Sequence, residues 1–416
     1  MLDSEIGRIP IRVWGELGSS LQPKERMYSH SVVDFMMTTM AIVSDRKATY
    51  LVNRTFHRED DNAFKLRTMT DLCERIGAQI SAASRDRSMQ ALAANGFSPT
   101  TGQPLPDAQL PLSITEPDIN TLPGYDIYAA ECSVRSKNKK AMLPELTETF
   151  EDPMMTCYVA IDDIGVKRQK GTRKDSESSS KKKKYVENTV VKVMSDDEEE
   201  ILTGIGMTGV FMMLLGFLLH NQLLVNQSLV FFTDGANNIR THIKDFFGFR
   251  PYRIILDWYH LQKKCGEYLS MAIKGTKIRN EILEQLKALL WVGDVKGARA
   301  LLKYTDEKVI KDKKQLDKLD AYFEKNTEFI PCYAVRAELK LKNSSSPVEK
   351  ANDLVVANRQ KHNGMSWSPD GSGALASIRA ILENGELKYW MENKTVPFTM
   401  HHHFAWADPY PSAKVA

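Results

Sequence analysis

Three apolar, β-prone runs that each carry an aspartate constrain this chain more than any other feature. Residues 228–237 read SLVFFTDGAN, so one run ends on Asp234. Residues 253–264, RIILDWYHLQKK, deliver Asp257 in the same way, and residues 155–170, MTCYVAIDDIGVKRQK, carry Asp162 and Asp163. Short continuous apolar runs are typical of strands that are buried on both faces of a sheet. The sequence therefore predicts buried strands that place carboxylates at or near their ends.

The order of the predicted elements indicates an α/β fold with a mixed sheet. Three strands come first, and they favour an antiparallel meander, whereas the later strands follow helices and favour parallel neighbours. In that order the ends of the first and fourth strands can lie side by side, which would bring Asp162 and Asp234 together. The predicted strands are 156–168, 185–194, 200–204, 228–233 and 252–257, and the predicted helices between them are 207–221 and 237–247.

The first 98 residues have apolar positions at helical spacing. Within them, residues 68–97 are predicted to form two short helices around Gly77. One interpretation is a helix-turn-helix, in which Ser81 to Arg87 begin an exposed helix suited to the major groove of DNA. A plain helical hairpin fits the same residues. In the first interpretation the inward-facing positions are Leu72, Ile76 and Ile80.

Composition narrows the class of protein. The formal charge is only +3, so any nucleic-acid surface has to be local, and basic blocks such as KKKK at 181–184 fit either such a surface or ordinary solvated side chains.

Five cysteines without a CxxC pair argue against a disulfide framework or a zinc ribbon, and they fit a reducing cytoplasm. The apolar run 210–219 is half the length of a membrane span and predicts a buried helix.

A glycine-rich stretch offers a remote alternative. Residues 204–209, GIGMTG, match the G-x-G-x-x-G pattern of dinucleotide sites, which would suggest a nucleotide-dependent oxidoreductase. The strand before it is short and led by acids, and this interpretation leaves Asp162, Asp257 and His260 unexplained. Close packing of the following helix on the sheet is the favoured use of these glycines.

A divalent-metal site is the other interpretation of the acids. Hard cations such as Mg²⁺ prefer carboxylate oxygens, and a pair of such ions can activate a water or a 3′-hydroxyl for phosphodiester displacement. Each acid also has a structural explanation. An Asp before Gly commonly forms an Asx-turn, and Glu349 stands three residues after Ser346 in a capping-box pattern that also includes Pro347.

Four segments together resemble the DDE transposases of bacterial insertion sequences, in groups distantly related to the Mutator-like transposases. They are VAIDDIGVKRQK, TDGA, LDWYHLQKK and VEKANDLVVANRQKHNGMSWSPDGSGAL, and the resemblance covers roughly residues 150–392. It implies a ribonuclease-H-like core with an all-α insertion. The implied activity is metal-dependent strand cleavage and strand transfer of DNA.

The resemblance also implies the site residues. The first acid is Asp162, with its neighbour Asp163 as the alternative, followed by Asp234 and Glu349. These acids would hold Mg²⁺, with Mn²⁺ as a substitute. Asp257 and His260 match a D-x-x-H motif that supports the active site in related superfamilies.

The implied partner is DNA, both the element's ends and the target. Arg359, Lys361 and Trp367 are expected to contact DNA near the active site, and a homo-oligomer is expected in the synaptic complex, with no membrane contact. The implied location is the bacterial cytoplasm, at the nucleoid. Two alternatives remain: a ribonuclease-H-like nuclease that only hydrolyses, and a transposase-derived DNA-binding protein without activity.

The sequence predicts six segments, which follow the changes in composition and the implied family architecture. They are a helical region (1–98), a linker and lead-in (99–150), the first part of the catalytic core (151–260), an all-helical insertion (261–342), the second part of the core with the glutamate (343–395) and a tail (396–416).

Overall fold

The computed structural model describes most of the chain between residues 28 and 402. The described ranges are 2–4, 7–9, 28–58, 63–106, 108, 110, 131–133, 140–142, 150–169, 184–225, 227–361 and 365–402. Two small antiparallel pairs within them were not predicted. They are β1 (Leu2–Ser4) with β2 (Gly7–Ile9), and β3 (Glu131–Ser133) with β4 (Lys140–Met142).

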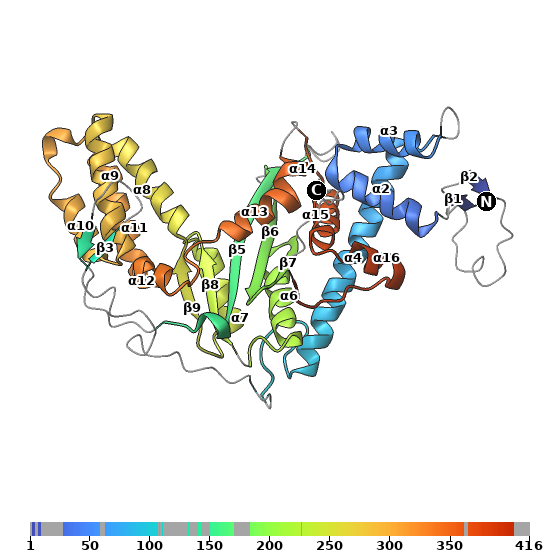
Figure 1. The fold of residues 1–416 in the computed structure, drawn as a ribbon, viewed down its shortest axis with the longest axis horizontal. Coiled ribbons are helices and arrows are strands. Elements are labelled where there is room, and N and C mark those ends of the chain that lie inside the picture. The colour runs from blue at the N-terminus through green and yellow to red at the C-terminus, as the bar shows by residue number, and fades with distance from the viewer. Residues whose placement is uncertain are drawn as a thin grey trace, which may run out of the picture.

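A six-stranded mixed sheet forms the centre of the molecule (Figure 1). Its first three strands form the predicted antiparallel meander, while β8 pairs in parallel with β5 and β9 pairs in parallel with β8. The spatial order is β10-β7-β6-β5-β8-β9. The strands are β5 (Thr156–Lys167), β6 (Tyr185–Ser195), β7 (Glu198–Ile205), β8 (Ser228–Thr233), β9 (Arg253–Leu256) and β10 (His401–His402).

Both faces of the sheet are covered by helices, because its strands are apolar on both sides. One core includes Val159 and Ile161 of β5, packed with α6 (Met207–His220), α7 (Asn237–Phe247) and the N-terminal helices. The other includes Tyr158 and Ala160, packed with residues of the insertion and of the segment after residue 345. Alternate residues of β5 therefore enter different cores, as the period of a strand requires.

The N-terminal region contains α2 (His30–Ile42), α3 (Asp45–Thr55) and α4 (Leu66–Ala94). The prediction of two short helices around Gly77 was wrong, because α4 runs through that residue without a turn. Gly77 instead allows close packing, since a Cβ there would collide with the backbone carbonyl of Ala374 in α15. Ser81, expected on an exposed helix, hydrogen-bonds the Ser377 hydroxyl at 2.7 Å.

The inward positions of that prediction were right: Leu72, Ile76 and Ile80 are all buried. What α4 packs against is the core itself, since it lies against α6 and α15. The helix-turn-helix interpretation and the helical-hairpin alternative are therefore both wrong, since neither has the turn that it needs.

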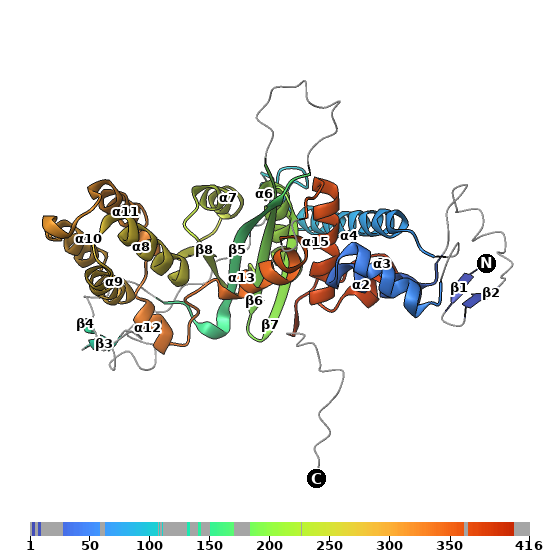
Figure 2. The same cartoon turned by 90° about the horizontal axis from the view of Figure 1, so that it is seen from above.

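The insertion and the C-terminal helices α15 and α16 lie toward opposite ends of the row of strands in the sheet. Figures 1 and 2 show the insertion beyond β9, and α15 and α16 with the N-terminal helices at the other end.

In the described part of the chain no helix combines the length and apolarity that a membrane span needs. The insertion contains α8 (Trp258–Ala272), α9 (Thr276–Trp291), α10 (Val295–Lys303), α11 (Lys313–Lys325) and α12 (Tyr333–Glu338).

The remaining helical segments are short or follow the insertion. They are α13 (Ser346–Asn352), a π-helix (Asp353–Ala357), α14 (Asn358–Gln360), α15 (Pro369–Glu383) and α16 (Leu387–Asn393), with 3₁₀ turns at Pro153–Met155, Glu307–Val309 and Thr327–Phe329.

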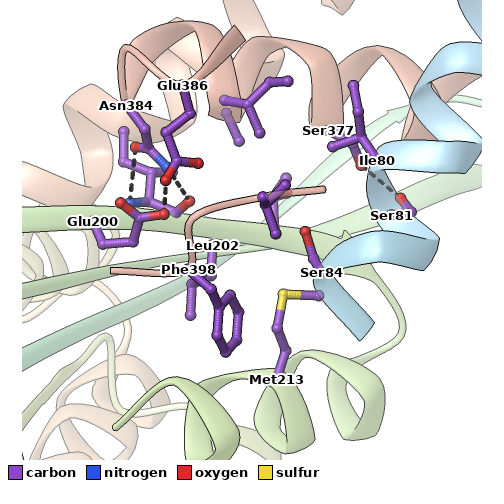
Figure 3. Close-up of a pocket in the computed structure, with 15 residues that line it drawn as sticks. Ile80, Ser81, Ser84, Glu200, Leu202, Met213, Ser377, Asn384, Glu386 and Phe398 are labelled. Carbon is purple, nitrogen blue, oxygen red and sulfur yellow. Dashed lines mark hydrogen bonds between the residues drawn. The ribbon is translucent and has the colours of Figure 1, made fainter. Parts of the chain in front are cut away.

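A buried acid cluster joins the C-terminal helices to the edge of the sheet (Figure 3). Glu200 of β7 accepts a hydrogen bond from Asn384 Nδ2 at 2.7 Å, and its Oε2 lies 2.8 Å from His401 Nδ1 in β10. Glu386 is buried beside them. Burial, and then the charge of Glu200, raise the pKa of Glu386 to about 9.

Substituting Gly77 by alanine should destabilise the protein by about 1–3 kcal/mol, because the helices have to separate to admit the methyl group. Gly209 in the first turn of α6 is the matched control, since a Cβ there meets nothing within 4 Å. Gly209→Ala should be neutral or stabilising by up to about 1 kcal/mol. Chemical denaturation of both variants measures the difference, and equal effects would contradict the packing role of Gly77.

Glu386→Gln should stabilise the protein at neutral pH and do so less at lower pH. A carboxyl group whose folded-state pKa is raised contributes most below its unfolded pKa, and that contribution is lost as pH rises toward 9. The gain at pH 7 should be about 2–3 kcal/mol and should shrink toward pH 4.5. Thermal unfolding across this range tests it, with Glu392→Gln, at an exposed position in α16, as the control. A pH-independent difference would contradict the assignment.

Candidate active site

The register of the parallel strands places Asp162 beside Asp234. Ala160 of β5 is paired with Phe232 of β8, and each aspartate lies two residues further along the chain, Asp162 within β5 and Asp234 just after β8. Asp257 follows β9 at the same edge, where its backbone N–H donates to the Thr233 carbonyl at 2.9 Å. The three acid-bearing segments of the sequence thus meet at the carboxyl ends of β8 and β9.

The two neighbouring aspartates of β5 point to opposite faces. Asp162 follows the alternation of Tyr158 and Ala160, and its Oδ2 accepts a hydrogen bond from Asn352 Nδ2 of α13 at 2.6 Å. Asp163 accepts from the Thr189 hydroxyl at 2.6 Å and lines a cavity of about 370 Å³ beside the start of α6. Asp162, and not Asp163, therefore shares a face with α13.

Asp234 forms the Asx-turn that its sequence predicts. Its Oδ1 accepts from the Ala236 N–H at 2.8 Å, and Gly235 has a φ of +89°, a conformation that favours glycine. The turn fixes the side chain between β8 and α7, so the structural explanation of this residue and its place at the site are compatible.

Asp257 is fully buried at the N-cap of α8. Its Oδ1 accepts from the His260 backbone N–H at 2.7 Å and lies 3.1 Å from His260 Nδ1. Its Oδ2 accepts from the backbone N–H of Ser345, just before α13. One carboxylate thus orients the His260 ring and also fixes the loop that leads to Glu349.

Glu349 faces His260, with its Oε1 3.5 Å from His260 Nε2. The capping-box interpretation of Glu349 was wrong. The helix begins at Ser346, so Ser345 holds the cap position, and it makes no side-chain cap bond in the described structure. The backbone N–H of Ser345, which a capping-box glutamate would accept from, donates to Asp257 instead.

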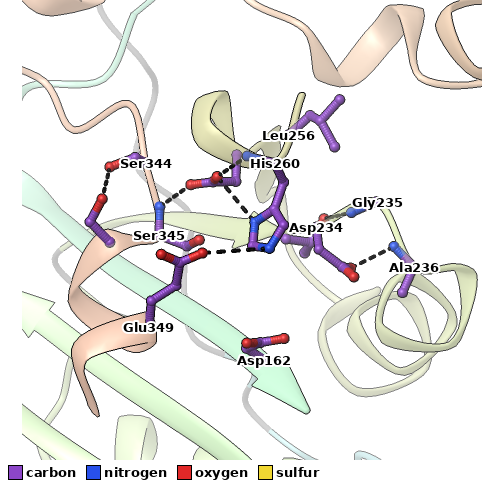
Figure 4. A network of polar contacts seen from close by, with 12 residues as sticks. Asp162, Asp234, Gly235, Ala236, Leu256, His260, Ser344, Ser345 and Glu349 are labelled. Atoms are coloured by element: carbon purple, nitrogen blue, oxygen red, sulfur yellow. Dashed lines mark hydrogen bonds and ion pairs between the residues drawn. The ribbon is translucent and has the colours of Figure 1, made fainter. Parts of the chain in front are cut away.

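Figure 4 shows the carboxyl groups of Asp162, Asp234 and Glu349 arranged around His260. Burial, and then the charge of Asp234, raise the pKa of Asp162 to about 6, and burial raises that of Glu349. The hydrogen bond to Asp257 raises the pKa of His260. Burial opposes ionisation of Asp257, but hydrogen bonds from His260 and Ser345 outweigh it and lower its pKa.

Three carboxylates are a donor set that suits a hard divalent cation, and a cation would relieve the repulsion that raises the pKa of Asp162. As they stand, no three His, Cys, Asp or Glu side chains among the described residues lie close enough to form a metal site. Glu349 is turned toward His260 and Asp162 toward Asn352. The chemistry of the donors therefore fits a cation, while their present orientations are set by protein partners.

The predicted DNA contacts differ in exposure. Lys361 is exposed, whereas Arg359 is only 4% exposed and its guanidinium is bound by the Met40 carbonyl, by Asp45 and by the ring of Trp367. Trp367 is partly buried, with its indole N–H donating to the Gln360 carbonyl at 3.1 Å. Arg359 therefore joins α14 to α2 and α3, Trp367 pairs through its backbone with the end of β5, and of the three predicted contacts only Lys361 is exposed.

The GIGMTG stretch has a structural use. Gly206 has a φ of +94° between β7 and α6, and a Cβ on Gly204 would press on Val210. In the sheet β7 is antiparallel to both of its neighbours, β6 and β10. A dinucleotide site needs a parallel βαβ unit with adjacent strands, so the oxidoreductase alternative is not supported.

Sequence reasoning missed Asn352, which contacts Asp162 directly. The available signal was its spacing, because a residue three positions after Glu349 lies on the same face of a helix. That signal becomes useful only once Glu349 has been assigned.

No protein family model matches the chain, and no curated protein matches it in sequence. Among solved structures, it is similar to the Drosophila P element transposase strand transfer complex. The similarity has 10% identity and a TM-score of 0.27, over 91% of this chain and 83% of that chain. A TM-score of this size does not establish a common fold.

Asp257→Asn should destabilise the protein by about 2 kcal/mol at pH 7, because a buried charged acceptor of hydrogen bonds is replaced by a weaker one. A carboxyl group with a lowered folded-state pKa stabilises above its unfolded pKa, so the difference from wild type should shrink below about pH 4. Asp294→Asn is the control, since Asp294 also caps a helix and asparagine caps as well. Urea unfolding at pH 7 and pH 3.5 measures both, and a loss that is equal at the two pH values would contradict this role.

Proposed function

We propose that this chain is a DNA transposase with a ribonuclease-H-like core, which cleaves and transfers DNA strands with the help of a divalent cation. The observation that carries the proposal is the meeting of Asp162, Asp234 and Glu349 around His260. They come from a central strand, from the end of its parallel neighbour and from a helix that follows a long insertion.

The topology supports the fold part of the proposal. Counted along the chain from β5, the strand order is 3-2-1-4-5, with antiparallel pairing among the first three and parallel pairing beyond. Ligands of open α/β sheets bind outside the carboxyl ends of parallel strands, and Asp234 and Asp257 stand at such ends. Asp162, Asp234 and Glu349 thus lie at the carboxyl ends of the parallel strands, where a substrate can approach.

We assign two kinds of role to these residues, namely binding the cation and orienting its ligands. Asp162, Asp234 and Glu349 would hold Mg²⁺ or Mn²⁺, which when bound activates a water or a 3′-hydroxyl and steadies the leaving oxygen. Asp257 holds the ring of His260, and His260 in turn holds Glu349. Removing Asp257 or His260 would therefore disturb the orientation of Glu349, although neither is required as a ligand.

DNA is the partner that this chemistry requires. A formal charge of +3 means that clustered basic side chains have to supply the phosphate contacts, and Lys361 is one exposed cation in the segment after α13. Assembly of two or more copies on paired DNA ends, at the bacterial nucleoid, is part of the proposal.

Asp162→Asn, Asp234→Asn and Glu349→Gln should each lower strand cleavage at least about 100-fold while leaving DNA binding largely intact. Each removes a charge that acts on the transition state, whereas contacts elsewhere hold the phosphates. The measurement is cleavage and joining of a plasmid that carries the DNA flanking this reading frame, with Mg²⁺ or Mn²⁺, alongside a gel-shift assay.

Two matched controls sharpen the test. Asp163→Asn changes the same residue type on the opposite face of β5, and Asp353→Asn changes an exposed acid beyond Glu349, so both should stay active. Activity in Asp162→Asn combined with its loss in Asp163→Asn would reverse the assignment. Cleavage without joining would identify a nuclease, and binding without cleavage in the wild type would identify an inactive DNA-binding protein.

A further inference from the structure

Asn352 is the residue that joins the helix of Glu349 to the strand of Asp162. It ends α13, it is 4% exposed, and its Nδ2 donates to Asp162 Oδ2 at 2.6 Å. The other oxygen of Asp162 accepts from the Asp163 backbone N–H at 2.9 Å. Both oxygens of this carboxylate are therefore oriented by the protein, and Asn352 is the one side chain among the described residues that does so.

The amide of Asn352 is held at one end only. Its Oδ1 is buried and has no hydrogen-bond partner among the described residues. Buried amides with a purely structural role usually have both ends satisfied, because an unpaired buried polar atom costs free energy. The bond to Asp162 is thus the one polar contact described for this buried side chain.

Asn384 shows the contrasting arrangement in the same protein. It is 5% exposed, and its Nδ2 donates to Glu200 Oε1 at 2.7 Å and to the Ile201 carbonyl at 3.0 Å. Its Oδ1 accepts from the Ile201 N–H at 3.1 Å. Asn384 is also an amide bound to a carboxylate, but it is tied at both ends and lies in the acid cluster of β7 and α16.

The helix changes from α to π geometry directly after Asn352. The π-helix begins at Asp353, directly after Asn352, and its wider turn shifts the positions that follow. Val355 and Val356 then enter the core, while Glu349 and Asn352 keep the i, i+3 spacing that puts both on the side of the acids. Val348 and Ala351 of α13 lie in the same core before the π-turn, so the segment contacts the core on both sides of Asn352.

We propose that Asn352 is a positioning residue of the candidate active site, which fixes the Asp162 carboxylate for a divalent cation. The inference rests on the proposed function, because it assumes that Asp162 binds such a cation. Asn352 donates to one oxygen of Asp162 and leaves lone pairs of both oxygens for the ion. It also connects α13, the helix that carries Glu349, directly to the carboxylate of Asp162.

The test measures Mn²⁺ binding to the full-length protein without DNA, by titration calorimetry and by the electron paramagnetic resonance signal of free Mn²⁺. Asn352→Ala and Asn352→Leu should weaken binding by about 10- to 100-fold, the usual effect of losing a group that orients a metal ligand. Asn384→Ala removes an equally buried amide–carboxylate contact elsewhere and should leave the affinity unchanged.

A double-variant cycle separates positioning from a general structural effect. If Asn352 acts through Asp162, Asn352→Ala should weaken Mn²⁺ binding much less in an Asp162→Asn background than in the wild type. Wild-type affinity in both Asn352 variants, or equal losses in the two backgrounds, would overturn the proposal. Failure of both variants to fold would also overturn it, since Asn352 would then be structural.

The failures of the two proposals can be distinguished. Tight Mn²⁺ binding with the same affinity in the wild type and the Asn352 variants, together with loss of cleavage in Asp162→Asn, would overturn only the positioning role. Absence of Mn²⁺ binding by the folded wild type, together with metal-independent cleavage or none, would overturn the cation site itself and this inference with it.

Discussion

The buried carboxylate of Asp257 is the interaction on which the arrangement of this site depends. It caps α8, where the insertion begins, and it accepts from the Ser345 N–H, where the chain returns to the core. One side chain therefore fixes both ends of a helical segment of more than eighty residues. The contact holds the point where the chain returns to the core, so Glu349 lies beside the sheet although it is remote in sequence from β5 and β8.

The second constraint is the alternation of side chains along β5. Because both faces of the sheet are buried, each residue of this strand is committed to one of two cores. Asp162 belongs to the face covered by α13, and Asp163 to the face beside α6 and α7. The pair Asp-Asp in the sequence looks redundant, yet a strand gives its two members different surroundings. A shift of register by one residue would exchange them and bury the wrong charge.

The sequence predicted five of the six strands, because their signals were local and strong, and it missed β10, which lies in the predicted tail. Apolar runs, their lengths and the glycine at the end of β8 define the strands, and the short connections leave few ways to pair them. It also predicted that Asp162 and Asp234 would be neighbours, since strand order alone implies it. Their metal-binding role and the segment boundaries remain predictions.

The features that the sequence did not predict depend on contacts between distant segments. Gly77 resembles a helix breaker until Ala374, nearly three hundred residues away, is packed against it. The capping pattern around Ser346 was plausible locally, but Asp257 had already engaged the neighbouring backbone. Arg359 resembled an exposed cation in a basic segment, and only the fold reveals Asp45 beside it. In each case a tertiary partner overrides a local preference.

The two acid clusters of this protein show how partners decide what a buried carboxylate can do. In the first cluster the amide of Asn384 and the ring of His401 lie against the oxygens of Glu200, and the raised pKa of Glu386 favours a neutral, structural group. Around Asp162 the repulsion from Asp234 is only partly offset, since His260 is also engaged by Asp257 and Glu349. A cluster that remains short of positive charge is less stable in isolation, and it is suited to bind a cation for the same reason. Stability is thus lowered at the end of the strands where chemistry is proposed.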